Sequence, residues 1–477
     1  MMPVYIPVVV LLVAGFLTPL IGIRLKFLRR ILVSSSLLFS FLFFVFLSPS
    51  IFPNEIIVQN VSSWLPPIGI NMVLDSFSLI FLLLITGIGF LASLVVEKYV
   101  HERRSEFYSL FLLMIVGMMG IVLTGDLFNL YVFYEIMCIS SYGLIVFYRT
   151  KKSTEAAIKY LLISALGSSL ILLGIALTYG LTGTLNLADI ITKLPENSAI
   201  PFSLIFVGFA IKAGLVPFHI WLPDAHSEAP IPVSVMLSGV LVKMGLYVLL
   251  RLYVLFDINY LSVMLILGLA SIIVGDLMAL QQKDIKRMLA YSTISQVGYI
   301  SFALGLGTIG FVAGTFHLIN HVLIKSMLFL IAGSIVLKVK TRDMTKMKGL
   351  GSSMPVEAIG FLIGAFAISG IPPLNGFASK FMIYMATLNS GYSFLVFIPI
   401  IFSVVTLGYY LRAFFTIFGG AGKKKEKIDW TLALPVLVLA LLCVVIGLFP
   451  QMITQNLQLV INSLLDKANY YCAVLGC

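Results

Sequence analysis

The sequence predicts an all-α membrane protein that crosses the bilayer many times. Of its 477 residues, 60% are hydrophobic and only 11% are charged, and the mean hydropathy is +1.08. A soluble globular protein carries about 25% charged residues. The apolar residues fall in runs of about 20, which is the length that spans a bilayer as a helix. Between these runs we find no polar region large enough to form a soluble domain.

The apolar runs predict about 14 spans. They lie at 3–23, 27–48, 70–96, 107–124, 127–148, 157–182, 201–221, 231–256, 259–280, 287–306, 309–336, 356–386, 392–418 and 430–450. We expect the first to be a retained helix rather than a cleaved signal peptide, because its cations (Arg24, Lys26, Arg29 and Arg30) follow it. The tail 451–477 is amphipathic at best.

The distribution of basic residues predicts the orientation. With the N-terminus outside, most of the 31 lysines and arginines fall in inside connections, whereas only Lys193, Arg251 and Lys467 fall outside. Cytoplasmic loops carry such an excess of positive charge. We therefore expect a cell-membrane protein with cytoplasmic basic loops and both termini outside. The net charge of +11 then reflects orientation rather than nucleic-acid binding.

Two features predict an inverted repeat. The pattern I-S-x-x-G-x-I occurs at 139–145 and again at 294–300, five spans later, so the two copies run in opposite directions. Proline also interrupts the spans near Lys212 (Pro217) and near Lys380 (Pro372 and Pro373), which predicts broken helices 7 and 12. Two ordinary proline kinks are the alternative. The predicted parts are 1–106 (helices 1–3), 107–256 (repeat 1), 257–420 (repeat 2) and 421–477 (helix 14 and tail).

Charged residues inside the spans predict a proton path. A charge at the bilayer centre costs about 2.5–3.5 kcal/mol on insertion scales, so a set of them indicates function. The set comprises Glu135, Lys212, Lys243, Lys325, Lys380 and Arg412. Glu135 and Lys212 form either a proton switch or a static ion pair. Lys243 and Lys380 are either relay stations or structural partners of carbonyl groups, and Arg412 stabilises the thirteenth helix.

Histidines extend the predicted path. His317, His321 and Lys325 are spaced i, i+4, i+8, so they share one helix face. Histidine passes protons near neutral pH, which favours a proton wire; a metal site would need a third ligand, and none is evident. His219, Asp224, His226 and Glu228 lie at the inner end of the seventh span, where they either lead protons towards Lys212 or form a capped loop. Asp75 and Asp276, near span ends, are expected to be solvated or paired.

The sequence predicts no resident cofactor. None of the four cysteines forms a C-x-x-C pair or lies near histidine at ligand spacing, which argues against iron–sulfur, zinc and haem sites. Cys472 and Cys477 either pair with each other or stay free. The chain also carries no flavin or nucleotide motif, so an autonomous redox enzyme is not expected.

Long motifs resemble one family of membrane proteins. The run from Lys212, KAGLVPFHIWLPDAHSEAPIPVSVMLSGVLVKMG, is similar to the antiporter-like subunits of respiratory complex I, of Mrp-type sodium/proton antiporters and of membrane-bound energy-converting hydrogenases. DIKRMLAYSTISQVGYI from Asp284, HLINHVLIKSMLFL from His317 and SGIPPLNGFASK from Ser369 fit the same family. The resemblance covers about 70–420. Chain length and the loop at 60–70 look most like the D-type subunit of Mrp antiporters and its hydrogenase relatives.

The resemblance implies both architecture and residue roles. It implies 14 helices, two inverted five-helix repeats, a half-channel in each repeat and a central polar axis. By motif position, Glu135 and Lys212 match the family's ion pair and Lys243 its central lysine. His317, His321 and Lys325 match the connecting element and Lys380 the terminal relay, where some members carry glutamate.

We therefore expect a proton-translocating subunit of a larger membrane complex. Its partners would be hydrophobic subunits of an Mrp-like or complex I-like assembly, with or without a peripheral iron–sulfur arm. Transport would be coupled to redox chemistry or Na⁺ exchange in those partners. The alternatives are a subunit of a stand-alone Mrp-type Na⁺/H⁺ antiporter and a structural membrane scaffold. Sodium needs carboxylate or carbonyl ligands, so the scarcity of acids within the spans favours protons.

Overall fold

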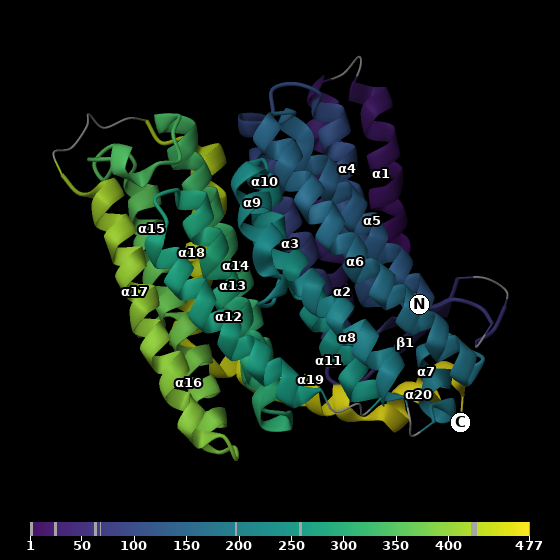
Figure 1. Cartoon of the computed structure of the whole chain (residues 1–477). Helices are drawn as coiled ribbons and strands as arrows, with labels where there is room; N and C mark the ends of the chain where they lie inside the picture. The colour runs from purple at the N-terminus through teal and green to yellow at the C-terminus, as the bar shows by residue number, and fades with distance from the viewer. Residues whose placement is uncertain are drawn as a thin grey trace. The chain divides into compact units, whose positions relative to one another are not determined.

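The computed structural model describes residues 3–22, 26–61, 64–66, 68–195, 198–256, 260–420 and 427–476. This part is almost entirely helical (Figure 1), and eleven of its helices are long and apolar enough to cross a membrane. The prediction of an all-α protein with many membrane spans is thereby confirmed. Arg24 and Cys477 lie outside the described residues.

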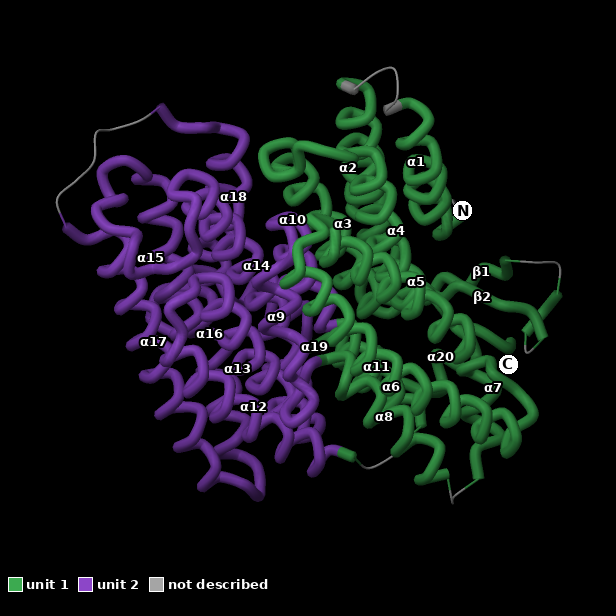
Figure 2. The backbone as a smooth tube through the Cα atoms, turned by 45° about the horizontal axis from the view of Figure 1, so that its top comes forward, with its two compact units in different colours: residues 1–213, 244–260, 458–477 green, residues 214–243, 261–457 purple. Residues whose placement is uncertain are grey.

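The chain folds as two compact units (Figure 2). Unit 1 comprises 1–213, 244–260 and 458–477. Its elements are α1 (Ile6–Gly22), α2 (Lys26–Ile51), β1 (Ile57–Asn60), β2 (Asn71–Leu74), α3 (Ser76–Tyr99), α4 (Arg104–Leu123), α5 (Leu127–Ile145), η1 (Val146–Tyr148), α6 (Lys151–Thr182), α7 (Leu187–Lys193), α8 (Ala199–Ala213), most of α11 (Val242–Phe256) and α20 (Lys467–Leu475). The two strands pair antiparallel, with Ile57 opposite Leu74.

Unit 2 comprises 214–243 and 261–457. Its elements are η2 (Phe218–Ile220), α9 (Trp221–Glu228), α10 (Ile231–Met236), η3 (Leu237–Leu241), α12 (Leu261–Gln281), α13 (Ile285–Gly305), α14 (Thr308–Val339), η4 (Met344–Lys346), α15 (Pro355–Ser369), α16 (Asn375–Leu388), η5 (Ser393–Val396), α17 (Phe397–Phe418) and α18 (Trp430–Leu448). The boundary between the units falls within α19 (Gln451–Leu465). The four-part division at 106, 256 and 420 stays a prediction.

Every predicted span overlaps a helix or an interrupted pair of helices, although the number 14 and the inverted repeats stay predictions. Helix starts follow from capping residues. Asp75 accepts the backbone N–H of Ser78 at 2.8 Å, and Asp126 accepts that of Asn129 at 2.7 Å. Such caps satisfy amide groups that the first helical turn leaves unpaired. The third helix therefore begins at Ser76, whereas the apolar run predicted a start near 70, because that run includes strand β2.

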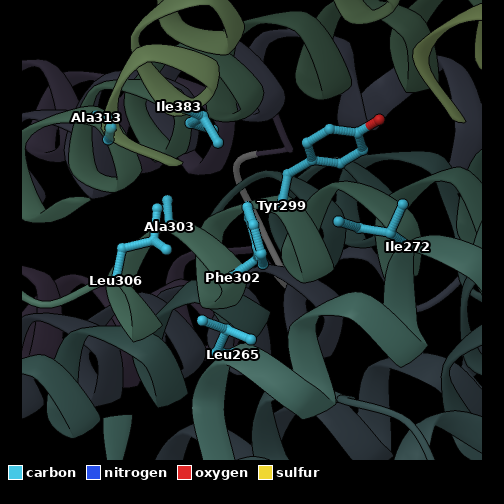
Figure 3. Packing of buried hydrophobic residues seen from close by; sticks show 9 residues of the cluster. Leu265, Ile272, Tyr299, Phe302, Ala303, Leu306, Ala313 and Ile383 are labelled. Carbon is cyan, nitrogen blue, oxygen red and sulfur yellow. The ribbon is translucent and has the colours of Figure 1, made fainter. Parts of the chain in front are cut away.

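Helix α12 packs along α13 in unit 2. A Cβ atom on Gly268 would lie 2.4 Å from the backbone nitrogen of Phe302, so only glycine permits this close approach. Around the contact, Leu265, Ile272, Phe302 and Ile383 form a buried apolar cluster with Tyr299 (Figure 3). The hydroxyl of Tyr299 donates to the carbonyl oxygen of Pro399 at 2.6 Å. The apolar core thus fixes the position of the Tyr299 hydroxyl.

The predicted amphipathic character of the tail is confirmed in α19. Leu457, Ile461 and Leu464 are buried, whereas the polar residues Gln458 and Asn462 are exposed. This spacing of three and four residues is that of one helix face.

A buried ion pair in unit 1 corrects the prediction for Arg251. We expected this residue in an outside connection, but it lies in α11 and is only 5% exposed. Its guanidinium donates to both carboxylate oxygens of Asp75, at 2.5 and 3.0 Å. A buried arginine requires such a partner, and Asp75 is accordingly paired rather than solvated.

Candidate functional site

Glu135 of α5 and Lys212 of α8 are in contact in unit 1. The Lys212 ammonium lies 3.2 Å from Oε1 of Glu135. The Ser168 hydroxyl of α6 donates to the same carboxylate oxygen at 2.5 Å and accepts from Lys212 at 2.7 Å. The lysine side chain is 1% exposed and that of the glutamate 26%. The buried ammonium is thereby coupled to a carboxylate that reaches the surface of unit 1.

The remaining partners of Lys212 were not predicted from the sequence. The ammonium donates to the Ser164 hydroxyl at 2.7 Å and to the Cys138 sulfur at 3.4 Å, and it lies 5.3 Å from the centre of the Tyr134 ring. Ser164 and Ser168 are four residues apart and thus share a helix face. That spacing in an apolar helix is a signal that could have identified them.

Both predicted helix breaks are present. Helix α8 ends at Ala213, one residue after Lys212, and the chain resumes helical structure at Phe218. Helix α15 ends at Ser369, and α16 begins at Asn375, five residues before Lys380. At each break a glycine, Gly214 or Gly370, has a positive φ, of 67° and 83° respectively.

We expect Gly370→Ala to disturb the second break. The left-handed conformation costs a residue with a Cβ about 1–2 kcal/mol, and the added Cβ would lie 3.0 Å from Cδ of Lys380. The variant should therefore lower both the melting temperature of the purified protein and any activity that depends on Lys380. Gly408→Ala is the matched control, because no atom lies within 4 Å of its added Cβ. Equal melting temperatures for the two variants would contradict the prediction.

Lys243 is fully buried in unit 2, at the start of α11. It follows a π-helical segment, η3, which no local sequence signal had indicated. Its ammonium donates to the backbone carbonyl of Ser238 in that segment. The Ser238 hydroxyl in turn lies 2.7 Å from that of Thr293 on α13. The carbonyl contact that was the alternative for Lys243 is therefore present, on a helix distortion that is common at functional sites.

His317, His321 and Lys325 are all fully buried on α14. His317 hydrogen-bonds through one ring nitrogen with Ser379 of α16 at 2.9 Å and through the other with Gln296 of α13 at 3.1 Å. The rings of His317 and His321 are stacked, with centroids 6.4 Å apart. The structure therefore brings the two histidines together as their spacing predicted.

Lys325 and Lys380 have separate polar partners. Lys325 donates to the backbone carbonyl of Leu289 at 2.9 Å and to the Tyr410 hydroxyl at 3.0 Å. Lys380 donates to Ser403 of α17 at 3.0 Å, and its ammonium lies 4.3 Å from the centre of the Tyr299 ring. Neither lysine is left without a hydrogen-bond acceptor.

His321 is different, because neither ring nitrogen has a hydrogen-bond partner in the described part of the chain. A buried polar group without a partner costs about 1–3 kcal/mol. His226 on α9 is also fully buried with both ring nitrogens unpartnered, and its ring stacks on Phe329 at 5.2 Å.

The remaining charged and histidine residues predicted near the path do not form one cluster, and each has its own surroundings. Asp224 forms an ion pair with Arg287 at 2.5 Å, and Glu228 forms one with Arg342 at 2.9 Å. His219 is half-buried in η2. Arg412 is exposed and donates to the carbonyl oxygen of Gln282, consistent with a helix-stabilising contact.

The fold and these buried ionisable residues define a membrane protein of the antiporter-like class. Residues 124–406 match the family described as "NADH:quinone oxidoreductase/Mrp antiporter, TM". The chain is 34% identical over 466 residues to the D-type subunit of the Na⁺/H⁺ antiporter of Alkalihalophilus pseudofirmus, covering 94% of each chain. It is 32% identical to the N-type subunit of the NADH-quinone oxidoreductase of Desulforudis audaxviator, covering 95% of this chain and 97% of the relative. The chain belongs to this family.

Two solved structures resemble the fold over nearly its whole length. One is a chain of the membrane-bound sulfane sulfur reductase, an archaeal respiratory membrane complex, with a TM-score of 0.94, 33% identity and 99% of both chains covered. The other is a chain of the Mrp complex from a Dietzia species, with a TM-score of 0.92, 28% identity and 98% of both chains covered. The predicted family is confirmed, and its members include subunits of antiporter and reductase complexes.

Proposed function

We propose that this chain is a proton-translocating subunit of a larger membrane complex. Protons would enter from the cytoplasmic side past His219, Asp224 and His226. They would then pass the buried residues Glu135, Lys212, Lys243, His317, His321, Lys325 and Lys380. The predicted inverted repeats at 107–256 and 257–420 would each supply half of the path.

The contact between Glu135 and Lys212 is the observation that carries the proposal. A carboxylate beside a buried lysine favours the ammonium form. If Glu135 approaches, Lys212 holds its proton, and if Glu135 withdraws, the lysine releases it. The 3.2 Å contact through one carboxylate oxygen, with Ser168 bonded to both groups, permits such a change without breaking a helix. A static ion pair is the alternative.

The position of His321 beside His317 supports a relay. His321 lies beside His317, with its nitrogens unpartnered in the described residues. Imidazole can take up a proton at one nitrogen and release it from the other, which suits a relay that also uses water.

The relatives suggest how transport would be driven. Their names describe subunits of Na⁺/H⁺ antiporters and of quinone or sulfane sulfur reductases. We therefore propose hydrophobic partner subunits, with redox chemistry or Na⁺ exchange located in those partners. A stand-alone Mrp-type antiporter is the second candidate. The proposed location is the cytoplasmic membrane, with basic loops inside and both termini outside.

The first experiment identifies the partner subunits, so that transport can then be measured in the reconstituted complex. Mass spectrometry of the gently solubilised complex would find iron–sulfur subunits if transport is redox-driven, and only small hydrophobic subunits if it is a Mrp-type antiporter. The complex is then reconstituted into vesicles and driven by the partner's substrates or by a Na⁺ gradient.

We expect Lys243→Met to reduce proton transport to the level of empty vesicles, because methionine fills the buried site but cannot carry a proton. The exposed Lys151→Met on α6 is the control. Full transport by an assembled Lys243→Met complex would favour the structural scaffold.

A further inference from the structure

Asp276 of α12 is a buried carboxylate that the proposed path does not use. It is 0% exposed. Among the described residues of unit 2 it is the only buried acid, whereas the buried bases are Lys243, Lys286, Lys325, Lys380, His226, His317 and His321. A buried ammonium group without a negative partner is strongly destabilised. Among the described residues, Asp276 is therefore the one buried carboxylate of this unit that can neutralise a protonated lysine in its interior.

The contacts of Asp276 favour its ionised form. Thr406 donates to one carboxylate oxygen at 3.1 Å and Tyr409 to the other at 3.0 Å. Both hydroxyls come from α17. Hydrogen bonds donated to a carboxylate stabilise its charge. These two hydroxyl groups, which carry no charge of their own at neutral pH, therefore stabilise the carboxylate against the cost of its burial.

The same helix connects Asp276 to Lys380. Ser403, three residues before Thr406 and thus one helical turn away, accepts the hydrogen bond from the Lys380 ammonium at 3.0 Å. Asp276 and Lys380 also interact electrostatically. One turn of α17 therefore holds the acid through Thr406 and the lysine through Ser403.

The arrangement parallels that of unit 1. There, hydroxyls of α6 contact a buried lysine next to a helix break, and a carboxylate on another helix interacts with it. In unit 2 the hydroxyls come from α17, the lysine follows the break between α15 and α16, and the carboxylate comes from α12. In both units, hydroxyl groups of one helix bind a buried lysine that interacts electrostatically with a carboxylate of another helix.

We propose that Asp276 is the counter-ion that stabilises the protonated form of Lys380, the role proposed above for Glu135 at Lys212. This inference rests on the proposed function and adds one residue to it. Asp276 acts through Lys380 and is therefore a positioning residue. Other titratable groups around the pair are Tyr299 of α13, His317, His321 and Lys325 of α14, Tyr384 of α16, and Tyr409 and Tyr410 of α17. None of them is a carboxylic acid, so Asp276→Asn removes the negative charge selectively.

The test is the pH profile of proton transport by the reconstituted complex. Asp276→Asn keeps the size of the side chain and one acceptor oxygen but removes its charge. The ammonium form of Lys380 then loses its counter-charge, so the alkaline limb of the profile should move to lower pH by about one unit or more. Asp276→Glu should retain the original limb. Asp189→Asn, a buried acid of α7 that pairs with Lys193, is the matched control and should leave the profile unchanged.

Lys380→Met separates this inference from the proposed function. If Lys380→Met transports protons normally, the proposed function fails at its terminal residue. If Lys380→Met abolishes transport but Asp276→Asn keeps the wild-type profile, only the inference fails. If Asp276→Asn does not assemble, the double variant with Lys380→Met decides. Recovery of assembly means that the uncompensated lysine caused the defect, and no recovery overturns the counter-ion role.

Discussion

Replacing Lys212 with methionine is expected to abolish proton transport by the reconstituted complex while the complex still assembles. Methionine keeps most of the length of the buried side chain but cannot bind a proton. Lys212 donates to Ser164, Ser168 and Glu135. After the substitution the serine hydroxyls can bond within α6, where Ser168 already donates to the Ser164 carbonyl at 3.0 Å, and Glu135 keeps its partial access to solvent. Structural damage should therefore be small.

Glu135→Gln should have a graded effect in the same assay. The glutamine can still accept a hydrogen bond, but the charge that favours the ammonium form of Lys212 is gone. Hydrogen bonds to charged groups contribute about 1.5–3 kcal/mol, so transport should fall by about tenfold to a hundredfold rather than to the level of empty vesicles. Transport is measured as dye-reported acidification of vesicles, with Lys152→Met, an exposed residue near the start of α6, as the control. Normal transport by Lys212→Met would rule out the proposed switch.

The sequence was sufficient for the helices and for the charged residues within them. Long apolar runs have few alternatives in a bilayer, because every backbone polar group must be satisfied within the chain. A charged side chain inside such a run is rare because it is costly in a bilayer, and this cost made Lys212, Lys243 and Lys380 identifiable from the sequence. The prolines near Lys212 and Lys380 also predicted both interruptions correctly, since proline cannot continue the hydrogen bonding of a helix. Histidine spacing predicted the contact between His317 and His321.

The hydrogen-bond partners of these residues could not be predicted. Ser168 and Ser403 are ordinary small polar residues, and only the packing of α6 and α17 brings them to a lysine. The place of Asp276 near the end of an apolar run predicts that it is solvated or paired. The structure shows it fully buried and hydrogen-bonded. The π-helical turn before Lys243 depends on tertiary contacts and has no local sequence signature. Position along a helix alone does not determine burial.

Arg251→Met is expected to cause a larger loss of stability than Gly370→Ala or any of the lysine substitutions. The Arg251 guanidinium bonds both oxygens of Asp75 and also donates to Ser78 at 2.8 Å and to Tyr247 at 3.1 Å. It lies 5.8 Å from the ring centre of Tyr470 on α20. Removing one partner of a buried ion pair leaves an uncompensated charge, which costs about 3–5 kcal/mol. The melting temperature of the purified complex should fall accordingly.

The pH dependence of this loss follows from the pKa of Asp75. Burial raises that pKa, but the charge of Arg251 and the hydrogen bonds from Arg251 and Ser78 together lower it by more, so the pKa of Asp75 lies below its usual value. In the wild type the pair therefore stabilises the fold above the unfolded-state pKa of about 3.9 and is lost as the pH falls through the lower folded value. Without Arg251, protonation relieves the buried carboxylate, so the difference in melting temperature from the wild type should narrow as the pH is lowered.

The double variant Asp75→Asn with Arg251→Met distinguishes charge compensation from packing. Asparagine retains a side-chain acceptor for the N-terminus of α3, so the helix cap survives. Replacing both charged partners by uncharged groups of similar size is often neutral, whereas removing one is costly. The double variant should therefore melt closer to the wild type than Arg251→Met does. If it melts as low as that single variant, the contacts of the arginine with Ser78 and Tyr247, rather than its charge, hold these helices together.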